Sequence, residues 1–132
     1  MMIKMSSRAK PYTILIVDDA FIVREALRWA FENQVELLVI GEASDGPQAI
    51  AQAMTLSPDI VILDIELPLL DGYSVAQTLK ALPHPPLIIF LTVHADALSK
   101  QRCRELGADG FVEKGEGWTA LLAEIQNLVI DC

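Results

Sequence analysis

Short apolar runs alternate with longer amphipathic segments over almost the whole chain. This alternation constrains the fold more than any other feature of the sequence, because it predicts strands and helices in regular succession. The apolar runs are rich in valine, isoleucine and leucine, as expected for strands covered on both faces, and they lie at residues 13–17, 37–42, 60–63, 87–91 and 110–113. We expect the three middle runs to be the most deeply buried.

The segments after these runs have the spacing of amphipathic helices, and we expect helices at residues 20–33, 46–56, 74–82, 98–106 and 118–129. In the first helix, the apolar positions at helical spacing are Val23, Leu27, Ala30 and Phe31. The charged positions that fall on its other, solvated side are Arg24, Glu25, Arg28 and Glu32. Ile22 and Trp29 lie at the margin of the apolar stripe, and we expect them to pack at the edge of the core rather than to form a contact surface.

Proline and glycine separate these units. Pro58 and the prolines from position 83 onward disfavour helical geometry in the residues before them, and Gly107 is suited to end a helix. A strand is expected after each of these helix ends. Five strand and helix units in a row predict an α/β protein, with a five-stranded doubly wound parallel sheet flanked by five helices. In such sheets, ligands bind at the carboxyl ends of the strands.

Composition limits the size, the partners and the location of the protein. With 132 residues, 52% of them hydrophobic, we expect one domain at residues 11–132 after a disordered tail at residues 1–10. The net charge of −8 disfavours direct nucleic acid binding, which needs clustered lysine and arginine. The longest apolar runs fall short of the ~18 residues of a membrane span, and no signal peptide is recognisable. These features favour a cytoplasmic protein that does not enter a membrane.

The two cysteines support the same location. Cys103 and Cys132 have neither the spacing of metal ligands nor that of a disulfide framework, so they suit a reducing cytosol. Cys103 is expected to be a small buried side chain on a helix.

Three carboxylates close two of the expected strands. Asp18 and Asp19 follow residues 13–17, and Asp64 follows residues 60–63. Because parallel strands end at the same edge of a sheet, we expect these acids to converge in one pocket. Two like charges 4 Å apart repel by about 4 kcal/mol near a protein surface, so such a cluster favours a bound divalent cation. Asp18 or Asp19 alone could instead cap the following helix, since aspartate is a favoured N-cap.

Two further strand ends carry groups that suit phosphoryl chemistry. Thr92 follows residues 87–91, and Lys114 follows residues 110–113. Carboxylates hold Mg²⁺, one carboxylate can attack phosphorus to form an acyl phosphate, and an ammonium and a hydroxyl stabilise charge on phosphoryl oxygens. Taken singly, Thr92 is an ordinary strand-end hydroxyl and Lys114 a solvated lysine. The chain lacks both the dinucleotide and the P-loop glycine signatures, which disfavours those sites.

From about residue 11 onward, the sequence resembles the receiver domains of bacterial two-component response regulators, which have a flavodoxin-like fold. Four segments carry the resemblance, namely the pair Asp18-Asp19, residues 62–72 around Asp64, the triplet Leu91-Thr92-Val93, and residues 107–114 ending at Lys114. These motifs are specific to that family in combination.

The resemblance implies a role for each of these residues. Asp64 would accept a phosphoryl group from the phosphohistidine of a sensor histidine kinase or of a phosphotransfer protein. Asp19, Asp64 and the backbone carbonyl of Glu66 would ligate Mg²⁺, with Asp18 helping directly or through water. Thr92 and Lys114 would contact the phosphoryl oxygens. The implied activity is limited to Mg²⁺-dependent self-phosphorylation and dephosphorylation, so the protein is a signalling domain rather than an enzyme.

The same resemblance implies a conformational output. Phe111 would reorient when Thr92 moves, although simple packing beside the fourth helix is also compatible with its position. The output surface would comprise residues 98–129. Its partner is unknown and would be another protein or a missing DNA-binding domain, with a phosphorylation-dependent homodimer as a further option. We expect a receiver-only protein, and a longer open reading frame would overturn that expectation.

Two positions depart from the commonest family pattern, and two others lie where residues commonly tune dephosphorylation. Gly115 stands where a proline in a cis bond is frequent, which puts the approach of Lys114 in doubt. Val93 replaces a very small residue and should narrow access to Asp64. Glu66 and His94 occupy places that commonly tune dephosphorylation, and His94 is expected at the rim of the site.

Two other functions compete with this interpretation. A phosphatase of the haloacid-dehalogenase kind also uses a strand-end aspartate and Mg²⁺, but it needs a second aspartate where this chain has Glu66, and a cap insertion that does not fit here. A pseudo-receiver would bind partners without phosphorylation, because Gly115 and Val93 could spoil the site.

Overall fold

The computed structural model describes residues 10–93 and 96–129. Its five strands are β1 (Tyr12–Val17), β2 (Leu37–Ala43), β3 (Ile60–Leu63), β4 (Leu87–Thr92) and β5 (Gly110–Glu113). All adjacent strands pair in parallel, in the order β2-β1-β3-β4-β5. The helices are α1 (Phe21–Glu32), α2 (Gly46–Leu56), α3 (Gly72–Lys80), α4 (Ala97–Glu105) and α5 (Trp118–Val129), with a short 3-10 turn η1 (Lys114–Glu116) before the last. The predicted doubly wound α/β fold is therefore confirmed.

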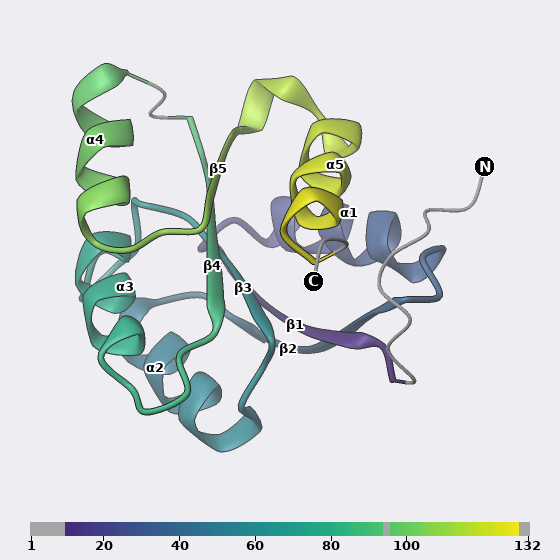
Figure 1. The fold of residues 1–132 in the computed structure, drawn as a ribbon, viewed down its shortest axis with the longest axis horizontal. Coiled ribbons are helices and arrows are strands. Elements are labelled where there is room, and N and C mark those ends of the chain that lie inside the picture. Colours follow the sequence, from purple (N-terminus) through teal and green to yellow (C-terminus); the bar gives the residue numbers. More distant parts are fainter. Residues whose placement is uncertain (1–9, 94–95, 130–132) are drawn as a thin grey trace.

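The helices cover both faces of the sheet, with α1 and α5 on one side and α2, α3 and α4 on the other (Figure 1). Side chains alternate between the two faces along each strand, because successive residues of a strand point in opposite directions. In β1, Ile14 and Ile16 belong to the core shared with α1 and α5, while Leu15 and Val17 belong to the core shared with α2, α3 and α4. Each face therefore has its own apolar core.

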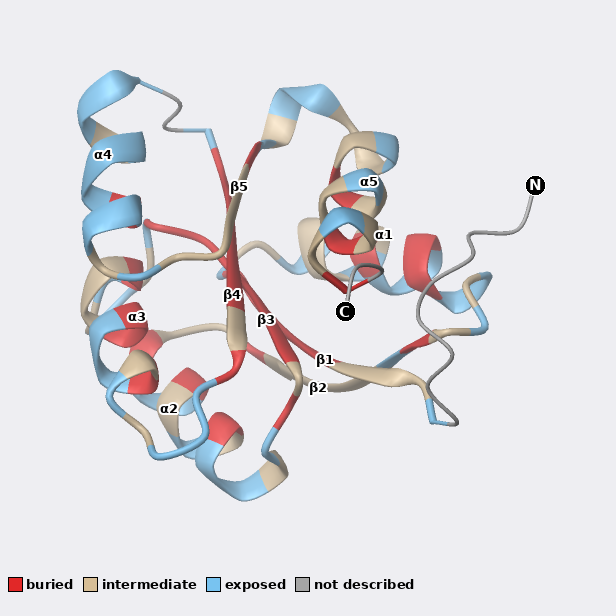
Figure 2. Ribbon diagram, viewed as in Figure 1, coloured by how far each residue is buried: buried red, intermediate tan, exposed pale blue. Residues whose placement is uncertain are grey.

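Burial follows the strand order rather than the order along the chain. The buried residues concentrate in β1, β3 and β4, at the centre of the sheet (Figure 2). The prediction that residues 37–42 are among the most buried is wrong, because β2 is an edge strand with only its first and last residues buried. Ile22 and Trp29 are 76% and 67% exposed, so the prediction that they pack at the edge of the core is also wrong.

The expected helix ends lie within two residues of the observed ones. Aspartate side chains cap α2, α3 and α4, where Asp45, Asp71 and Asp96 accept hydrogen bonds from the backbone nitrogens of Gln48, Ser74 and Ser99. The N-cap of α1 is instead Ala20, with no side-chain cap. Asp18 and Asp19 are therefore not the N-cap of α1.

Within the described residues, none of the helices has the length and apolar character needed to cross a membrane. The expected tail at residues 1–10 falls outside the described residues except for Lys10, which is exposed. Cys103 is buried, as predicted, and Cys132 lies outside the described residues.

Candidate functional site

Three carboxylates meet at the carboxyl edge of the sheet. Asp18 and Asp19 follow β1 and Asp64 follows β3, and these strands pair so that Val17 lies opposite Leu63. One oxygen from each carboxylate lies within 4.8 Å of the others. Asp18 and Asp64 are only 2% and 5% exposed, whereas Asp19 is exposed. The convergence expected from parallel strand ends is therefore present in the structure.

Lys114 extends into this cluster from the end of β5. Its Nζ lies 2.8 Å from Asp18 Oδ2 and 3.1 Å from Asp64 Oδ2. The turn that follows is held by Glu116, whose side chain accepts a 2.8 Å hydrogen bond from the backbone nitrogen of Glu113. Lys114 thus reaches both acids with Gly115 after it and with no cis peptide bond among the described residues. The doubt that Gly115 raised about its approach is removed.

Thr92 and Glu66 complete the set of groups around Asp64. Thr92 is the last residue of β4 rather than the first one after it, and its side chain is fully buried and hydrogen bonded with Asp64. Glu66 is exposed and lines a hollow of about 410 Å³ together with Asp19. Val93 is 62% exposed at the end of β4, and His94 lies outside the described residues.

Phe111 lies on β5, on the sheet face covered by α2, α3 and α4. Its ring is partly buried against the apolar core of that face, and Lys100 Nζ of α4 lies 5.7 Å from the ring centroid. The ring therefore sits between the sheet and α4, where either a packing role or a reorienting role has a structural basis.

The charges in the cluster shift each other's protonation. Burial raises the pKa of Asp64 above its ordinary value, and the nearby charge of Asp18 adds to the rise, while Lys114 and the hydrogen bond from Thr92 oppose it. For Lys114, burial favours the neutral amine, but the hydrogen bonds and charges of Asp18 and Asp64 outweigh burial and raise its pKa. The Lys114 ammonium therefore offsets only part of the cost of ionising the Asp64 carboxyl in this buried acidic cluster.

The raised pKa of Asp64 predicts that Asp64→Asn unfolds at a higher temperature than the wild type at neutral pH. A carboxyl whose folded pKa is raised contributes full stability below its unfolded pKa, and that contribution is lost as the pH rises through the folded pKa. Thermal melts of the two proteins between pH 7 and the ordinary aspartate pKa of about 4 should therefore converge as the pH falls. A constant difference over that range would contradict a raised pKa.

Two close backbone approaches fix the loop between β3 and α3. The backbone nitrogen of Gly72 donates a 2.7 Å hydrogen bond to the carbonyl of Ile65. A Cβ atom at Gly72 would lie 2.1 Å from the backbone oxygen of Asp64, and one at Gly46 would lie 2.2 Å from the backbone oxygen of Leu70. Glycine at these positions lets the chain fold back tightly beside Asp64.

The structure adds two arginines that the sequence pattern did not indicate as parts of the site. Arg24 of α1, expected on the solvated side of the helix, has a side chain only 15% exposed and donates a 2.8 Å hydrogen bond to the backbone carbonyl of Asp18. Arg102 of α4 stacks over Tyr73 at 4.0 Å from the ring centroid, and both line the hollow that contains Asp19. Spacing alone does not distinguish such arginines from solvated ones.

Comparison with known proteins assigns this arrangement to a family. The sequence matches the model of the response regulator receiver domain over residues 14–126. The chain belongs to the response regulator receiver family. Among curated proteins, this receiver domain is 34% identical over 113 residues to the DNA-binding transcriptional activator EvgA of Escherichia coli, and the match covers 85% of this chain and 54% of EvgA.

Relatives with different outputs carry the same domain. The receiver domain is 35% identical over 113 residues to a protein-glutamate methylesterase/protein-glutamine glutaminase of Caldanaerobacter subterraneus, which covers 85% of this chain and 31% of that protein. A solved response regulator of the LuxR family from Aurantimonas superposes with a TM-score of 0.84 at 29% identity, covering 89% of this chain and 84% of that chain. The chain thus spans about half or less of the length of these two curated relatives, and it is itself a response regulator receiver domain of two-component signalling.

Proposed function

We propose that Asp64 is the phosphoacceptor of this receiver domain and takes its phosphoryl group from the phosphohistidine of a sensor histidine kinase or a phosphotransfer protein. The observation that carries the proposal is the position of Lys114, whose Nζ contacts both Asp18 and Asp64 within a cluster of three strand-end acids. An ammonium and a group of carboxylates around one buried aspartate suit charge stabilisation during phosphoryl transfer.

The same acids fit a magnesium ion. Mg²⁺ prefers hard oxygen ligands and is usually bound by one or two carboxylates together with water and phosphate oxygens. Three carboxylates with one oxygen each within 4.8 Å, two of them buried, match that preference. Asp19, Asp64 and the backbone carbonyl of Glu66 would hold the ion, with Asp18 acting directly or through water. Bound Mg²⁺ would neutralise negative charge on the transferring phosphoryl group.

In the proposed reaction, a carboxylate oxygen of Asp64 attacks phosphorus. The new oxygen–phosphorus bond forms as the phosphorus–nitrogen bond of the phosphohistidine breaks, and the electron pair of that bond stays with the imidazole nitrogen. Lys114 and Thr92 would contact the phosphoryl oxygens, since the ammonium already lies 3.1 Å from Asp64 and the hydroxyl is hydrogen bonded with it. The protein's contribution is therefore placement of charge rather than proton transfer.

The phosphorylated aspartate would carry more negative charge and more acceptor oxygens than the free carboxylate, and it would draw Thr92 and Lys114 toward it. Thr92 ends β4 and Lys114 follows β5, so both lie beside the segments that lead into the output elements. Phe111 would follow the movement of Thr92, and residues 98–129 would form the output surface. Changing a two-state population from 1:99 to 99:1 takes about 5.5 kcal/mol, of which one ion pair and new hydrogen bonds supply a part.

The wider context of the domain is also a proposal. The receiver would occupy residues 11–132 of a cytoplasmic protein and act either on a protein partner, as part of a longer regulator with a DNA-binding domain, or through a phosphorylation-dependent homodimer. Relatives such as EvgA are transcriptional activators, which supports the longer form. The net charge of −8 argues against nucleic acid contact by the receiver itself.

The competing functions have less support. A phosphatase is disfavoured because the chain belongs to a signalling family and Glu66 stands two residues after Asp64. A pseudo-receiver is disfavoured because Lys114, Thr92 and the three acids are all present and close together. The proposed domain would self-phosphorylate and dephosphorylate without turning over other substrates.

Incubation with acetyl phosphate and Mg²⁺ tests the proposal. The intact mass is expected to increase by one phosphoryl group in the wild type, to remain unchanged without Mg²⁺, and to remain unchanged in Asp64→Asn. Asn retains the shape of the side chain but cannot act as an anionic nucleophile. No mass increase in the folded wild type, or an equal increase in Asp64→Asn, would refute the assignment of Asp64.

A further inference from the structure

Arg24 links the acidic loop after β1 to the edge strand β2. Its Nη1 donates a 2.8 Å hydrogen bond to the backbone carbonyl of Asp18, and its Nε donates a 3.0 Å hydrogen bond to Glu42 Oε1. The side chains of Arg24 and Glu42 are only 15% and 25% exposed. A guanidinium held between two acceptors has a fixed orientation, because its donors form a rigid planar fork.

The loop contacted by Arg24 carries two of the three clustered acids. The backbone nitrogen of Asp18 donates a 3.1 Å hydrogen bond to Ala43 of β2. Asp18 Oδ1 accepts a 2.9 Å hydrogen bond from the nitrogen of Ala20. Of these three contacts, only the hydrogen bond from Arg24 is made to the peptide that joins Asp18 to Asp19, while the other two hold the peptides on either side of it.

The position of Asp19 depends on that peptide. Asp19 is exposed, and its carboxylate makes no hydrogen bond or ion pair with any of residues 10–93 and 96–129. Its direction is therefore set by its backbone rather than by a side-chain partner. Rotation of the peptide between Asp18 and Asp19 would turn the Asp19 carboxylate away from Asp64. A donor that fixes the Asp18 carbonyl opposes that rotation.

We infer that Arg24 is a positioning residue for the metal-binding acids, with Glu42 orienting its guanidinium. This inference rests on the proposed function, since it concerns the magnesium site that the three carboxylates would form. Arg24 touches neither the metal position nor the phosphoryl group. It acts through the Asp18 carbonyl, as outer-sphere hydrogen bonds orient metal ligands in other proteins.

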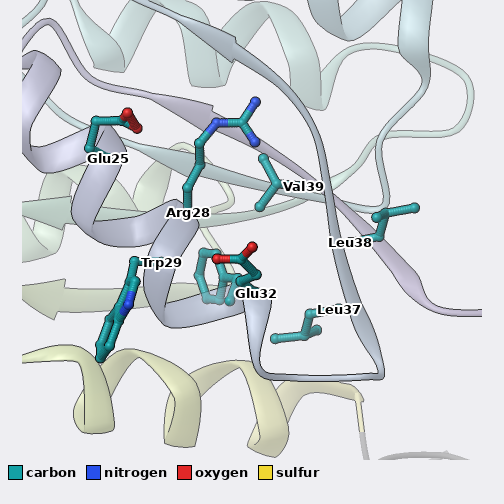
Figure 3. Close-up of a pocket in the computed structure, with 8 residues that line it drawn as sticks. Glu25, Arg28, Trp29, Glu32, Leu37, Leu38 and Val39 are labelled. Atoms are coloured by element: carbon teal, nitrogen blue, oxygen red, sulfur yellow. The ribbon is translucent and has the colours of Figure 1, made fainter.

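Arg28 provides a matched control on the same helix. It also forms an ion pair with Glu42, but its side chain is 47% exposed and it makes no contact with Asp18 among the described residues. Figure 3 shows Arg28 beside Val39 in the hollow between α1 and β2, with Glu25, Trp29 and Glu32 of α1 around it. Replacement of Arg28 therefore removes one positive charge from α1 and one ion pair from Glu42, but it leaves the hydrogen bond between Arg24 and the Asp18 carbonyl in place.

Calorimetric titration with Mg²⁺ tests the inference on the full chain. Arg24→Met is expected to weaken Mg²⁺ binding roughly tenfold, at the lower end of the 10–100-fold losses seen for outer-sphere partners. Arg28→Met is expected to bind Mg²⁺ as the wild type does. Arg24→Lys should recover only part of the affinity, because one ammonium cannot reproduce both directions of the guanidinium.

Hydrogen exchange in the metal-free proteins gives a second measurement that does not require the ion. The amides of Asp18 and Ala20, which donate hydrogen bonds to Ala43 and to Asp18 Oδ1, are expected to exchange faster in Arg24→Met than in the wild type and in Arg28→Met, with unchanged exchange in β3 and β4. Faster exchange throughout Arg24→Met would instead indicate general destabilisation and would overturn the inference.

The outcomes separate this inference from the proposed function. Equal Mg²⁺ affinity of the wild type and Arg24→Met, or an equal loss in Arg28→Met, overturns the positioning role and leaves the phosphoacceptor assignment intact. Failure of the folded wild type to bind Mg²⁺ overturns the proposed metal site, and the positioning role with it.

Discussion

Lys114→Met is expected to lower the free energy of unfolding by about 3 kcal/mol at pH 7, at the lower end of the cost of removing one partner from a buried ion pair. The ammonium lies 2.8 Å from Asp18 and 3.1 Å from Asp64, which are almost fully buried. Methionine fills a similar volume but leaves two carboxylates facing each other without a cation. Urea denaturation monitored by circular dichroism would measure the loss.

The proposed cause predicts how a second substitution and pH change this loss. In the background of Asp64→Asn, Lys114→Met should cost less, with a coupling free energy of about 1 kcal/mol or more between the two sites. The cost should also decrease as the pH falls from 7 toward the ordinary aspartate pKa, because Asp64 becomes protonated in the folded variant. Independent effects of the two substitutions would show that the acids do not interact with the lysine energetically.

The raised pKa of Lys114 sets the opposite limit. A lysine whose folded pKa is raised contributes its full stability below its unfolded pKa of 10.5, and this contribution is lost as the pH rises through the folded value. Above pH 7, the difference between wild type and Lys114→Met should therefore persist and then shrink in strongly alkaline solution. This dependence distinguishes a lost charge from a lost packing contact, which would not vary with pH.

The meeting of Asp18, Asp19, Asp64 and Lys114 could be predicted from the sequence because it depends on one property of parallel sheets. Their strands all end at the same edge, so residues that follow different strands converge whatever the strand order is. The apolar runs located the strand ends within one or two residues, which was sufficient for this purpose. The resemblance to receiver domains then supplied a role for each residue.

The sequence could not predict which strands are central. The run at residues 37–42 begins with four consecutive apolar residues, yet β2 lies at the edge, because the chain crosses from β2 over β1 to reach β3. Strand order results from how the helices connect the strands across the two faces, and no local pattern of side chains encodes it. Ile22 and Trp29 are a separate case: they lie at the margin of the apolar stripe of α1, where helical spacing does not decide between burial and exposure, and they are exposed.

The burial of Arg24 could not be predicted from helical spacing. Helical spacing placed it with the solvated residues Glu25, Arg28 and Glu32, and this placement is correct for those three and wrong for Arg24. The Arg24 guanidinium is held against the protein by hydrogen bonds to two acceptors outside α1, the carboxylate of Glu42 and the backbone carbonyl of Asp18. A long side chain can place its apolar stem and its charged end in different surroundings, so spacing alone gives only the direction in which it starts.

Gly72→Ala is expected to destabilise the protein by about 3 kcal/mol, at the upper end of the usual cost of inserting a methyl group into a tightly packed position. The new Cβ would lie 2.1 Å from the backbone oxygen of Asp64 and 2.8 Å from Cα of Ile65. Backbone atoms cannot move aside as a flexible side chain can, so the loop after β3 must shift. The shift would also displace Asp64, and we expect the rate of phosphorylation by acetyl phosphate to fall with stability.

Gly115→Ala is the matched control, because it adds the same methyl group next to another site residue. Apart from its chain neighbours, none of the residues that the structure describes has an atom within 4 Å of the position of its Cβ, and Gly115 does not have a positive φ. Its free energy of unfolding should remain within about 0.5 kcal/mol of the wild type. If both alanine variants were equally stable, the loop after β3 would have room to adjust, and the close approach of Gly72 to the Asp64 carbonyl would not be what holds the acceptor residue in place.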